Sequence, residues 1–306
     1  MLDALEKLLA QTKTEPMDGR RSLFSEKLDA ALESSGMLDA AGLDEFGIVA
    51  AALLVEEVSR LPTVVEVGAS ALIRPILCPS WPRPLAVIAG QRQRPARFMC
   101  QARSVVFIGE RDVRVAALEQ GDCASTESFF AYPMGRLLDP DACYARAEPC
   151  GDAREARRLL QISIACEIAG ALQGALASVT EHVTNRRQFG RPLGSFQTVQ
   201  HRLAACATNI AAIRLLARQA ADLGRVEDAL VALGYAQDCA PRMLYDLHQF
   251  MGAMGLTLEH PLYRWSYRVK LLLSKLGGAS RQLRDVAGAV WSAEIERPAG
   301  ADGKPR

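Results

Sequence analysis

The sequence has almost no net charge and no long apolar run. Its 36 Lys and Arg residues balance 35 Asp and Glu residues, which leaves a formal net charge of +1 over 306 residues. This balance gives no electrostatic basis for binding nucleic acid or an anionic membrane. We find no run of about eighteen apolar residues, so we expect no membrane-spanning helix. Residues 1–21 lack the apolar stretch of a signal peptide, and we expect a cytoplasmic protein.

Cysteine and histidine are present but not clustered. None of the eight cysteines forms a Cys-x-x-Cys pair, and the four histidines do not stand at ligand spacing from them. We therefore expect no metal site, and we expect buried free thiols, which are the default in a reducing cytoplasm. No histidine has the Ser or Cys partner that a nucleophilic triad needs.

The hydrophobic residues, 49% of the chain, fall into three segments of different pattern. Residues 1–78 show apolar spacings of three and four, which are typical of helices. Residues 79–150 open with closely spaced prolines and then carry short β-prone runs. Residues 151–296 return to helical periodicity, and residues 297–306 are expected to be a disordered tail. We predict a mainly α protein with an N-terminal helical domain, a reduced middle β-barrel or antiparallel sheet, and a C-terminal bundle of four to five helices.

Single elements can also be placed. The β-prone runs of the middle segment are residues 85–89, 97–101, 105–109 and 113–118. The helices of the C-terminal segment are expected over residues 153–187, 196–220, 227–251, 262–273 and 281–291. Pro241 falls inside the third of these, and an interior proline costs about 3 kcal/mol or more. We expect a kink there or two helices end to end.

The segment between the first two bundle helices breaks the periodicity abruptly. It reads Asn-Arg-Arg-Gln-Phe-Gly-Arg-Pro-Leu over residues 185–193. Gly190 and Pro192 should end one helix, and Ser195 can cap the next. Arg186 and its neighbour then lie at a helix C-terminus, where the macrodipole favours cations. An arginine fork there suits a pyrophosphate, and a solvated basic helix end is the alternative.

A second unusual segment, Gln-Phe-Met-Gly-Ala-Met-Gly, spans residues 249–255 after the third bundle helix. Glycine lets the backbone approach a ligand closely and adopts positive φ, which favours Gly252 as a ligand-facing position. Gln249 offers a side-chain amide to a phosphate or a ribose. Taken alone, the segment could be no more than a helix C-cap followed by a turn.

Together the two segments resemble the motifs of the acyl-CoA dehydrogenases, strongly over residues 153–291 and moderately over residues 20–78. In that family, Arg-x-x-Phe-Gly-x-x-Leu and Gln-x-x-Gly-Gly-x-Gly hold the FAD of the neighbouring chain across a subunit interface. The middle glycine of the second motif is replaced here by alanine. The cofactor-binding residues that the resemblance implies are Arg186, Gln188, Phe189, Gln197, Gln249, Gly252 and Ala253.

The same resemblance implies the order helical domain, β domain, helical bundle. It also implies an acyl-CoA substrate and electron transfer flavoprotein as the electron acceptor. The continuation Thr-Leu-Glu-His over residues 257–260 is similar to a branch of the family that handles bulky thioesters, including steroid side chains.

The residues that would perform the family's oxidation are missing. A carboxylate must come within hydrogen-bond reach of the α-proton of the thioester. The family places this glutamate at one of two positions, which Gly277 and Leu160 occupy here. Residues 79–149 match neither the Thr-Glu-Pro-x-Ala-Gly-Ser-Asp-like loop nor the Trp-Ile-Thr-Asn-like strand that cradle the flavin ring. No catalytic residue is therefore assigned.

These features predict one subunit of a heteromeric, FAD-dependent acyl-CoA dehydrogenase of lipid or steroid degradation. Its full-length partner would supply the flavin pocket and the catalytic glutamate. The first alternative is a self-sufficient homo-oligomeric dehydrogenase with its base relocated to Glu155 or Glu259. The second is a non-catalytic scaffold protein on the same fold.

Overall fold

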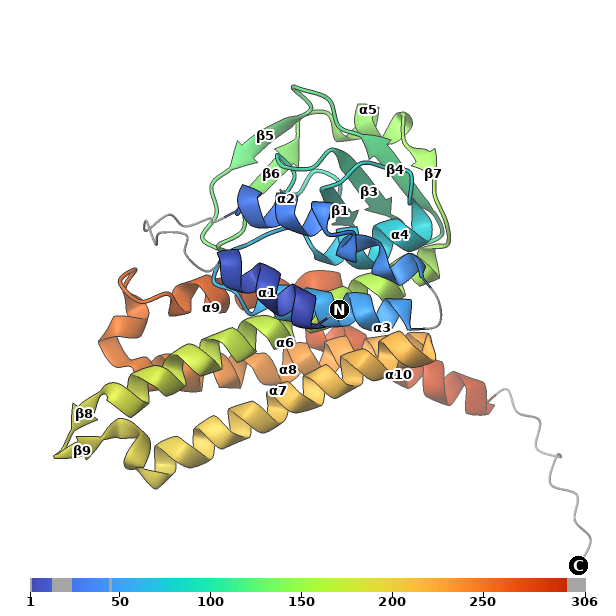
Figure 1. Ribbon diagram of the computed structural model, residues 1–306. Helices are drawn as coiled ribbons and strands as arrows, with labels where there is room; N and C mark the ends of the chain where they lie inside the picture. The colour runs from blue at the N-terminus through green and yellow to red at the C-terminus, as the bar shows by residue number, and fades with distance from the viewer. Residues whose placement is uncertain (1, 13–23, 44–45, 296–306) are drawn as a thin grey trace, which may run out of the picture.

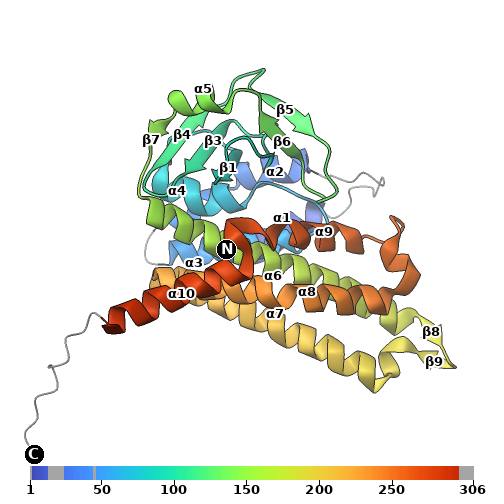
Figure 2. The ribbon, with the colours of Figure 1, turned by 180° about the vertical axis from the view of Figure 1, so that it is seen from behind.

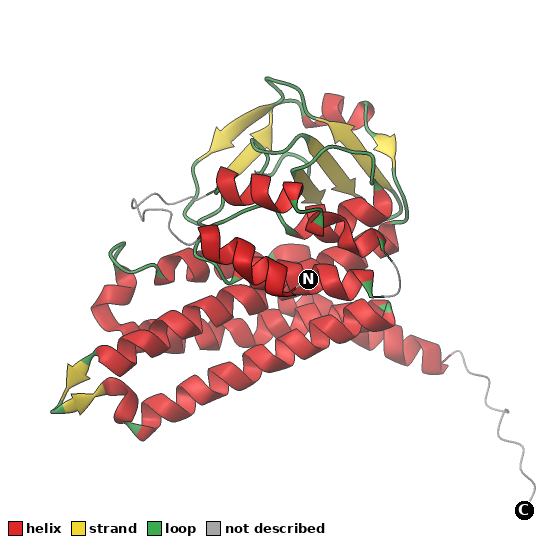
Figure 3. Cartoon of the chain, in the orientation of Figure 1, coloured by secondary structure: helices red, strands yellow, loops and turns green. Residues whose placement is uncertain are grey.

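The computed structural model describes residues 2–12, 24–43 and 46–295 (Figure 1). It has two layers, with small β-sheets and short helices on one side and long helices on the other. Helices make up most of the described chain (Figure 3), which confirms the predicted fold class. The domain boundaries drawn near residues 78 and 150 stay predictions. The expected tail, residues 297–306, lies outside the described residues.

The helices before the first strand are short. They are α1 (Leu2–Thr12), α2 (Glu26–Ser34), η1 (Met37–Gly42), α3 (Gly47–Ser59), η2 (Ala69–Ile73) and α4 (Arg74–Leu77). The Ser25 side chain caps α2, because its hydroxyl oxygen accepts a hydrogen bond from the backbone N–H of Leu28 at 3.2 Å. Gly36, at φ 69°, follows the end of α2 and turns the chain into η1. The apolar α3 packs against the first long helix of the other layer.

The strands form two sheets. The first has the order β1-β3-β4-β7, and the second has the order β2-β6-β5. Their bounds are β1 (Leu85–Ala89), β2 (Ala96–Arg97), β3 (Ser104–Ile108), β4 (Val113–Ala117), β5 (Cys123–Thr126), β6 (Met134–Leu137) and β7 (Glu148–Pro149). Of the two expected arrangements, a barrel or an antiparallel sheet, the antiparallel sheet is wrong for one pair, because β1 and β3 run parallel, whereas the other pairings within these two sheets are antiparallel. Every residue of β3 is buried, which is how parallel strands are usually covered.

The sequence prediction also missed elements at the end of the middle segment. The helix α5 (Pro140–Ala145) lies inside the middle segment and was not expected there. The Asp139 carboxylate accepts a hydrogen bond from the backbone N–H of Ala142 at 2.9 Å, and Pro140 occupies the first helical turn. Strands β5, β6 and β7 are short and were not expected.

The long helices of the second layer follow their predicted positions closely. They are α6 (Ala153–Asn185), α7 (Gln197–Leu223), α8 (Val226–Met251), α9 (Leu262–Leu272) and α10 (Gly278–Ile295). Shorter elements connect them: β8 (Arg187–Gln188), β9 (Arg191–Pro192), η3 (Leu193–Ser195), η4 (Gly252–Leu256) and η5 (Lys275–Gly277). Helix α8 contacts α6, α7 and α10, as the view from behind shows (Figure 2). Pro241 lies inside α8 without dividing it, so the alternative of two separate helices is wrong.

Helix α6 is the central element of the bundle. By length and composition alone, this helix could cross a membrane. The sequence does not suggest this, because the helix contains no unbroken run of about eighteen apolar residues. However, 78% of its most apolar window is buried inside the protein, as expected for a core helix. Asp152 caps its first turn, where its carboxylate accepts hydrogen bonds from the backbone N–H groups of Arg154 and Glu155, both at 2.9 Å.

The close approach of α3 and α6 predicts a stability effect at Gly170. A Cβ added there would collide with the Glu56 carbonyl oxygen and would lie 2.8 Å from the Ser59 Cβ. Because backbone atoms limit this contact, Gly170→Ala should lower the free energy of unfolding by about 1–3 kcal/mol. Urea denaturation would measure it.

Gly288 in α10 is the matched control, since a Cβ there would meet nothing within 4 Å. Gly288→Ala should leave stability unchanged or raise it by up to about 1 kcal/mol, because alanine favours helix. Equal effects of the two substitutions would contradict the close contact.

Candidate functional site

The first motif forms a hairpin at the end of the bundle. Helix α6 stops at Asn185, and β8 and β9 pair antiparallel around a tight turn. Phe189 and Gly190 have φ values of 54° and 80°, the left-handed pair that a two-residue hairpin turn requires. The predicted cap by Ser195 is wrong: Phe196 is the N-cap of α7, and the Ser195 hydroxyl donates to the Pro192 carbonyl at 2.7 Å.

The second motif forms the end of α8 and the following η4 turn. The helix stops at Met251, and Gly252 takes φ 63° and ψ −145°. A Cβ on Gly252 would meet nothing within 4 Å, so the residue faces open space and its conformation favours glycine. Gly255, by contrast, is buried against the Met251 side chain. The turn therefore presents the backbone around Gly252 to the exterior.

A cavity of about 610 Å³ lies between these two motifs and is called the clamp cavity below. Five of the seven predicted cofactor-binding residues line it: Arg186, Gln188, Gln249, Gly252 and Ala253. The other two do not. Phe189 is 86% exposed at the tip of the hairpin, where its ring packs edge-on against Phe196 at 6.1 Å. Gln197 is exposed outside the cavity lining.

Three polar side chains of the clamp cavity are free to meet a ligand. Among the described residues, none makes a hydrogen bond or ion pair with the side chains of Arg186, Gln188 or Gln249. An unpaired guanidinium with two amides is a donor set that suits a pyrophosphate. Burial and the charge of Arg186 lower the pKa of His182, so Arg186 is the cation of the lining and Glu259 is its carboxylate. The residues thus fit the phosphate end of a dinucleotide cofactor such as FAD.

Further lining residues were missed by sequence reasoning: His182, Phe250, Met254, Thr257 and Glu259. One of them had a detectable signal. His182 lies four residues before Arg186, a spacing that places two residues on one helix face.

The position of the clamp cavity separates it from this chain's own sheets. All of its lining residues lie within 182–199 and 249–259, and none belongs to β1–β7. The β8–β9 hairpin stands at the end of the bundle away from both sheets (Figures 1 and 2). A ligand held in the clamp cavity would therefore contact the bundle and not the residues of β1–β7.

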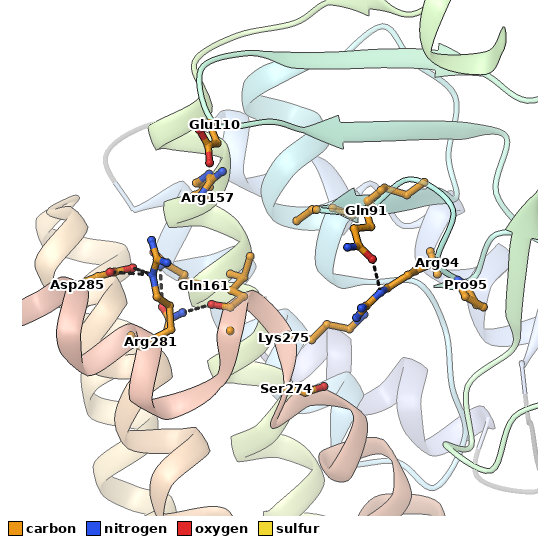
Figure 4. Close-up of a pocket in the computed structure, with 18 residues that line it drawn as sticks. Gln91, Arg94, Pro95, Glu110, Arg157, Gln161, Ser274, Lys275, Arg281 and Asp285 are labelled. Carbon is orange, nitrogen blue, oxygen red and sulfur yellow. Dashed lines mark hydrogen bonds and ion pairs between the residues drawn. The ribbon is translucent and has the colours of Figure 1, made fainter. Parts of the chain in front are cut away.

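The positions expected for a catalytic glutamate lie elsewhere, between the two layers. Gly277 lines a cavity of about 580 Å³, called the central cavity below (Figure 4). Leu160 lines a small neighbouring cavity of about 60 Å³. The carboxylates of the central cavity are Glu110 and Asp285, and Asp285 accepts two hydrogen bonds from Arg281 Nε, both at 2.9 Å.

The two acids proposed as relocated bases do not line the central cavity. Arg158 holds Glu155 through two hydrogen bonds of 2.7 and 2.6 Å. Glu259 lines the clamp cavity instead. In the small cavity, burial raises the pKa of Glu66, and the Ser70 hydroxyl and the backbone N–H groups of Ala69 and Leu85 donate to its carboxyl oxygens. The carboxyl group of Glu66 is therefore held by donors of the protein itself and has a structural role.

A buried ion pair lies beside the small cavity. Arg97 on β2 contacts Glu167 on α6, with 3.1 Å between Nη2 and Oε1. The Tyr132 hydroxyl donates to the same carboxylate at 3.1 Å. This cluster joins the β layer to the bundle. Elsewhere, all eight cysteines are free thiols, and in the described part of the chain no group of three His, Cys, Asp or Glu residues could hold a metal ion.

Comparison with known proteins identifies the fold. Residues 157–290 match the family model described as the acyl-CoA dehydrogenase C-terminal domain. Acyl-CoA dehydrogenase FadE28 of Mycobacterium tuberculosis is 36% identical over 137 residues, which are 42% of this chain and 40% of that protein. Acyl-CoA dehydrogenase IpdE2 of the same organism is 30% identical over 183 residues, 58% of this chain and 57% of that protein. These matches cover less than two thirds of the relatives' own lengths.

Solved structures cover nearly the whole chain. A Tcur3481–Tcur3483 steroid ACAD variant superposes with a TM-score of 0.75 at 21% identity, over 96% of this chain and 98% of that one. The ChsE4–ChsE5 complex from Mycobacterium tuberculosis gives a TM-score of 0.72 at 21% identity, over 97% and 95%. The chain therefore has the acyl-CoA dehydrogenase fold. Residues 157–290 match the model of that family's C-terminal domain, which supports the resemblance inferred from the two motifs for this part of the chain.

Proposed function

We propose that this chain is one subunit of a heteromeric, FAD-dependent acyl-CoA dehydrogenase. It holds the phosphate end of an FAD whose ring is seated in a longer partner chain. The partner also supplies the catalytic glutamate, and electron transfer flavoprotein takes the electrons. The observation that carries the proposal is the clamp cavity, where unpaired polar side chains gather at the end of the bundle away from this chain's own sheets (Figure 1).

Four residues of the clamp cavity would then contact the cofactor. Bound FAD would accept the hydride that leaves the β-carbon of the acyl-CoA thioester. Arg186 contributes the positive charge that the paired phosphates require, and its fork geometry fixes their orientation. Gln188 and Gln249 offer neutral amide donors. The open backbone at Gly252 allows close approach.

The interior of this chain supports the same division of labour. Gly277 provides no carboxylate, and Arg94, Arg157, Lys275 and Arg281 make the central cavity cationic. The small cavity at Leu160, at about 60 Å³, has room for little more than water. Substrate sites are usually lined by apolar side chains. Neither cavity has apolar walls that could enclose both an acyl chain and a flavin ring.

The steroid class of substrate is the narrower part of the proposal. One similar structure is described as a steroid ACAD, and another is a complex of ChsE4 and ChsE5. A likeness at 21% identity is evidence of shared fold only. The heteromeric arrangement therefore depends on the outward-facing clamp cavity and on the following experiment.

Expressed alone, the chain should carry no stoichiometric flavin, because the clamp cavity contacts only one end of the cofactor. Co-expressed with its longer partner, it should give a yellow complex that reduces an electron-accepting dye when an acyl-CoA is added. Flavin absorbance and dye reduction measure the two results. An isolated chain with one flavin per polypeptide and full turnover would overturn the proposal.

The alternatives find less support in the structure. A self-sufficient enzyme needs a free acid at the central cavity, where Glu110 is the carboxylate without an ion pair among the described residues. Glu110 is exposed, whereas a catalytic acid is usually poised by burial. A scaffold without redox work would not require unpaired donors at the clamp cavity. A visible flavin spectrum in the native complex would exclude it.

A further inference from the structure

The central cavity gathers positive charge from four separate segments. Arg94 comes from the β1–β2 loop, Arg157 from α6, Lys275 from η5 and Arg281 from α10. Figure 4 shows Lys275 and Arg94 on one side of the cavity, with Arg157, Gln161 and Arg281 on the other. Glu110 and Asp285 are the lining carboxylates, so two of the four positive charges remain uncompensated.

The three guanidinium groups are held in place before any ligand arrives. Arg157 donates from Nε and Nη2 to the Gly109 carbonyl at 3.2 and 2.8 Å. Arg94 Nε donates to Gln91 Oε1 at 2.7 Å, and Arg281 Nε donates to Asp285. Each keeps further N–H groups for which the described residues provide no acceptor. Fixed donors of this kind lower the ordering cost of binding.

Lys275 distinguishes this cavity from an ordinary basic surface. Its Nζ has no hydrogen bond or ion pair with any described residue, although the side chain lines both the central and the small cavity. Burial and, to a smaller extent, the charge of Arg97 lower the pKa of Lys275 to about 8, and the Glu167 carboxylate partly opposes them. An unpaired ammonium group in such surroundings is unfavourable unless an anion joins it.

Gln161 supplies a second unsatisfied group. It is 6% exposed and lines the same cavity. Its Nε2 donates to Gln282 Oε1 at 2.9 Å, and Gln282 Nε2 donates to the Leu276 carbonyl at 2.7 Å. This chain of donors fixes the amide orientation and leaves Gln161 Oε1 buried without a partner. A ligand with an O–H or N–H donor would satisfy it.

We propose that the central cavity binds a phosphate-bearing small molecule, whose anionic oxygens meet Lys275, Arg94, Arg157 and Arg281 and whose donor group meets Gln161. The site is separate from the clamp cavity and does not depend on the flavin proposal. A hydrogen phosphate ion, a nucleotide monophosphate and the 3′-phosphate of CoA share this chemistry. The probes below distinguish these sources.

Isothermal titration of the purified full chain with inorganic phosphate, AMP and CoA tests the proposal. At least one probe should bind, and the tightest identifies the source. Lys275→Met keeps the length of the stem and removes the charge, so it should weaken that binding about tenfold or more. Lys270→Met is the matched control, because Lys270 is exposed on α9 and does not line the central cavity. It should leave binding unchanged.

The pH dependence provides an independent readout. The protonated amine binds the anion, so affinity should fall as the pH rises through about 8, above the pH of about 6 at which a phosphate group itself titrates. The Lys275→Met variant should lose this dependence. Arg186→Ala at the clamp cavity should leave it intact, which separates a failure here from a failure of the flavin proposal. The site is rejected if no probe binds, or if Lys275→Met and Lys270→Met bind alike.

Discussion

Replacing Glu167 by glutamine should lower the free energy of unfolding by about 3–5 kcal/mol, because it breaks a buried ion pair on one side only. Glu167 is 6% exposed and bonds both Arg97 and Tyr132. Burial alone would lower the pKa of Arg97, but the Glu167 carboxylate and the Tyr132 hydroxyl outweigh it and raise that pKa. Without the carboxylate, a buried guanidinium loses its counter-ion.

Chemical denaturation monitored by circular dichroism would measure this loss. Asp285→Asn is a suitable control, because its pair with Arg281 is largely exposed and should contribute no more than about 0.5 kcal/mol. The double substitution Arg97→Leu with Glu167→Leu should cost less than Glu167→Gln, because no unpaired charge remains. A Glu167→Gln variant as stable as Asp285→Asn would show that the pair does not join the layers.

The bundle was predictable because one periodicity described each helix. Residues of α6 and α7 at spacings of three and four, such as Ile168, Leu172, Ile210 and Ile213, are buried in the core. Burial of one helix face leaves that spacing in the sequence. The sheets were less predictable. A β-prone run shows that a strand exists, whereas the parallel pairing of β1 with β3 depends on neighbours that local sequence does not specify.

The two cavities differ in the same way. The residues of the clamp cavity lie in two short segments with a recognisable order, so five of the seven predicted residues meet around it. Phe189 lies outside the cavity lining, because the hairpin turn puts its side chain at the exposed tip. The central cavity carries no such signal. Arg94 and Lys275 are far apart in sequence and meet only through the packing of the sheets on the bundle.

Replacing Arg186 by alanine should weaken flavin retention in the heteromeric complex by about 10- to 150-fold. A charge-assisted pair between a guanidinium and a phosphate is worth about 1.5–3 kcal/mol, and each 1.4 kcal/mol corresponds to a factor of ten. The side chain makes no hydrogen bond or ion pair with the described residues, so its removal should leave the fold intact. Equilibrium dialysis of FAD against the purified complex gives the dissociation constant.

Arg187 provides the matched control for this experiment. It is the next residue, carries the same charge and is also exposed, but it does not line the clamp cavity. Arg187→Ala should therefore change flavin affinity only slightly, through long-range charge that salt screens. If both variants weaken binding equally, the two arginines act only through the positive charge that they add to this end of the bundle. If neither does, the flavin is held elsewhere, and the clamp cavity has no part in it. Selective loss of affinity at Arg186 would instead place the cofactor's phosphate inside this cavity, at the end of the bundle away from both sheets (Figure 1), as expected if the flavin ring is held by a second chain.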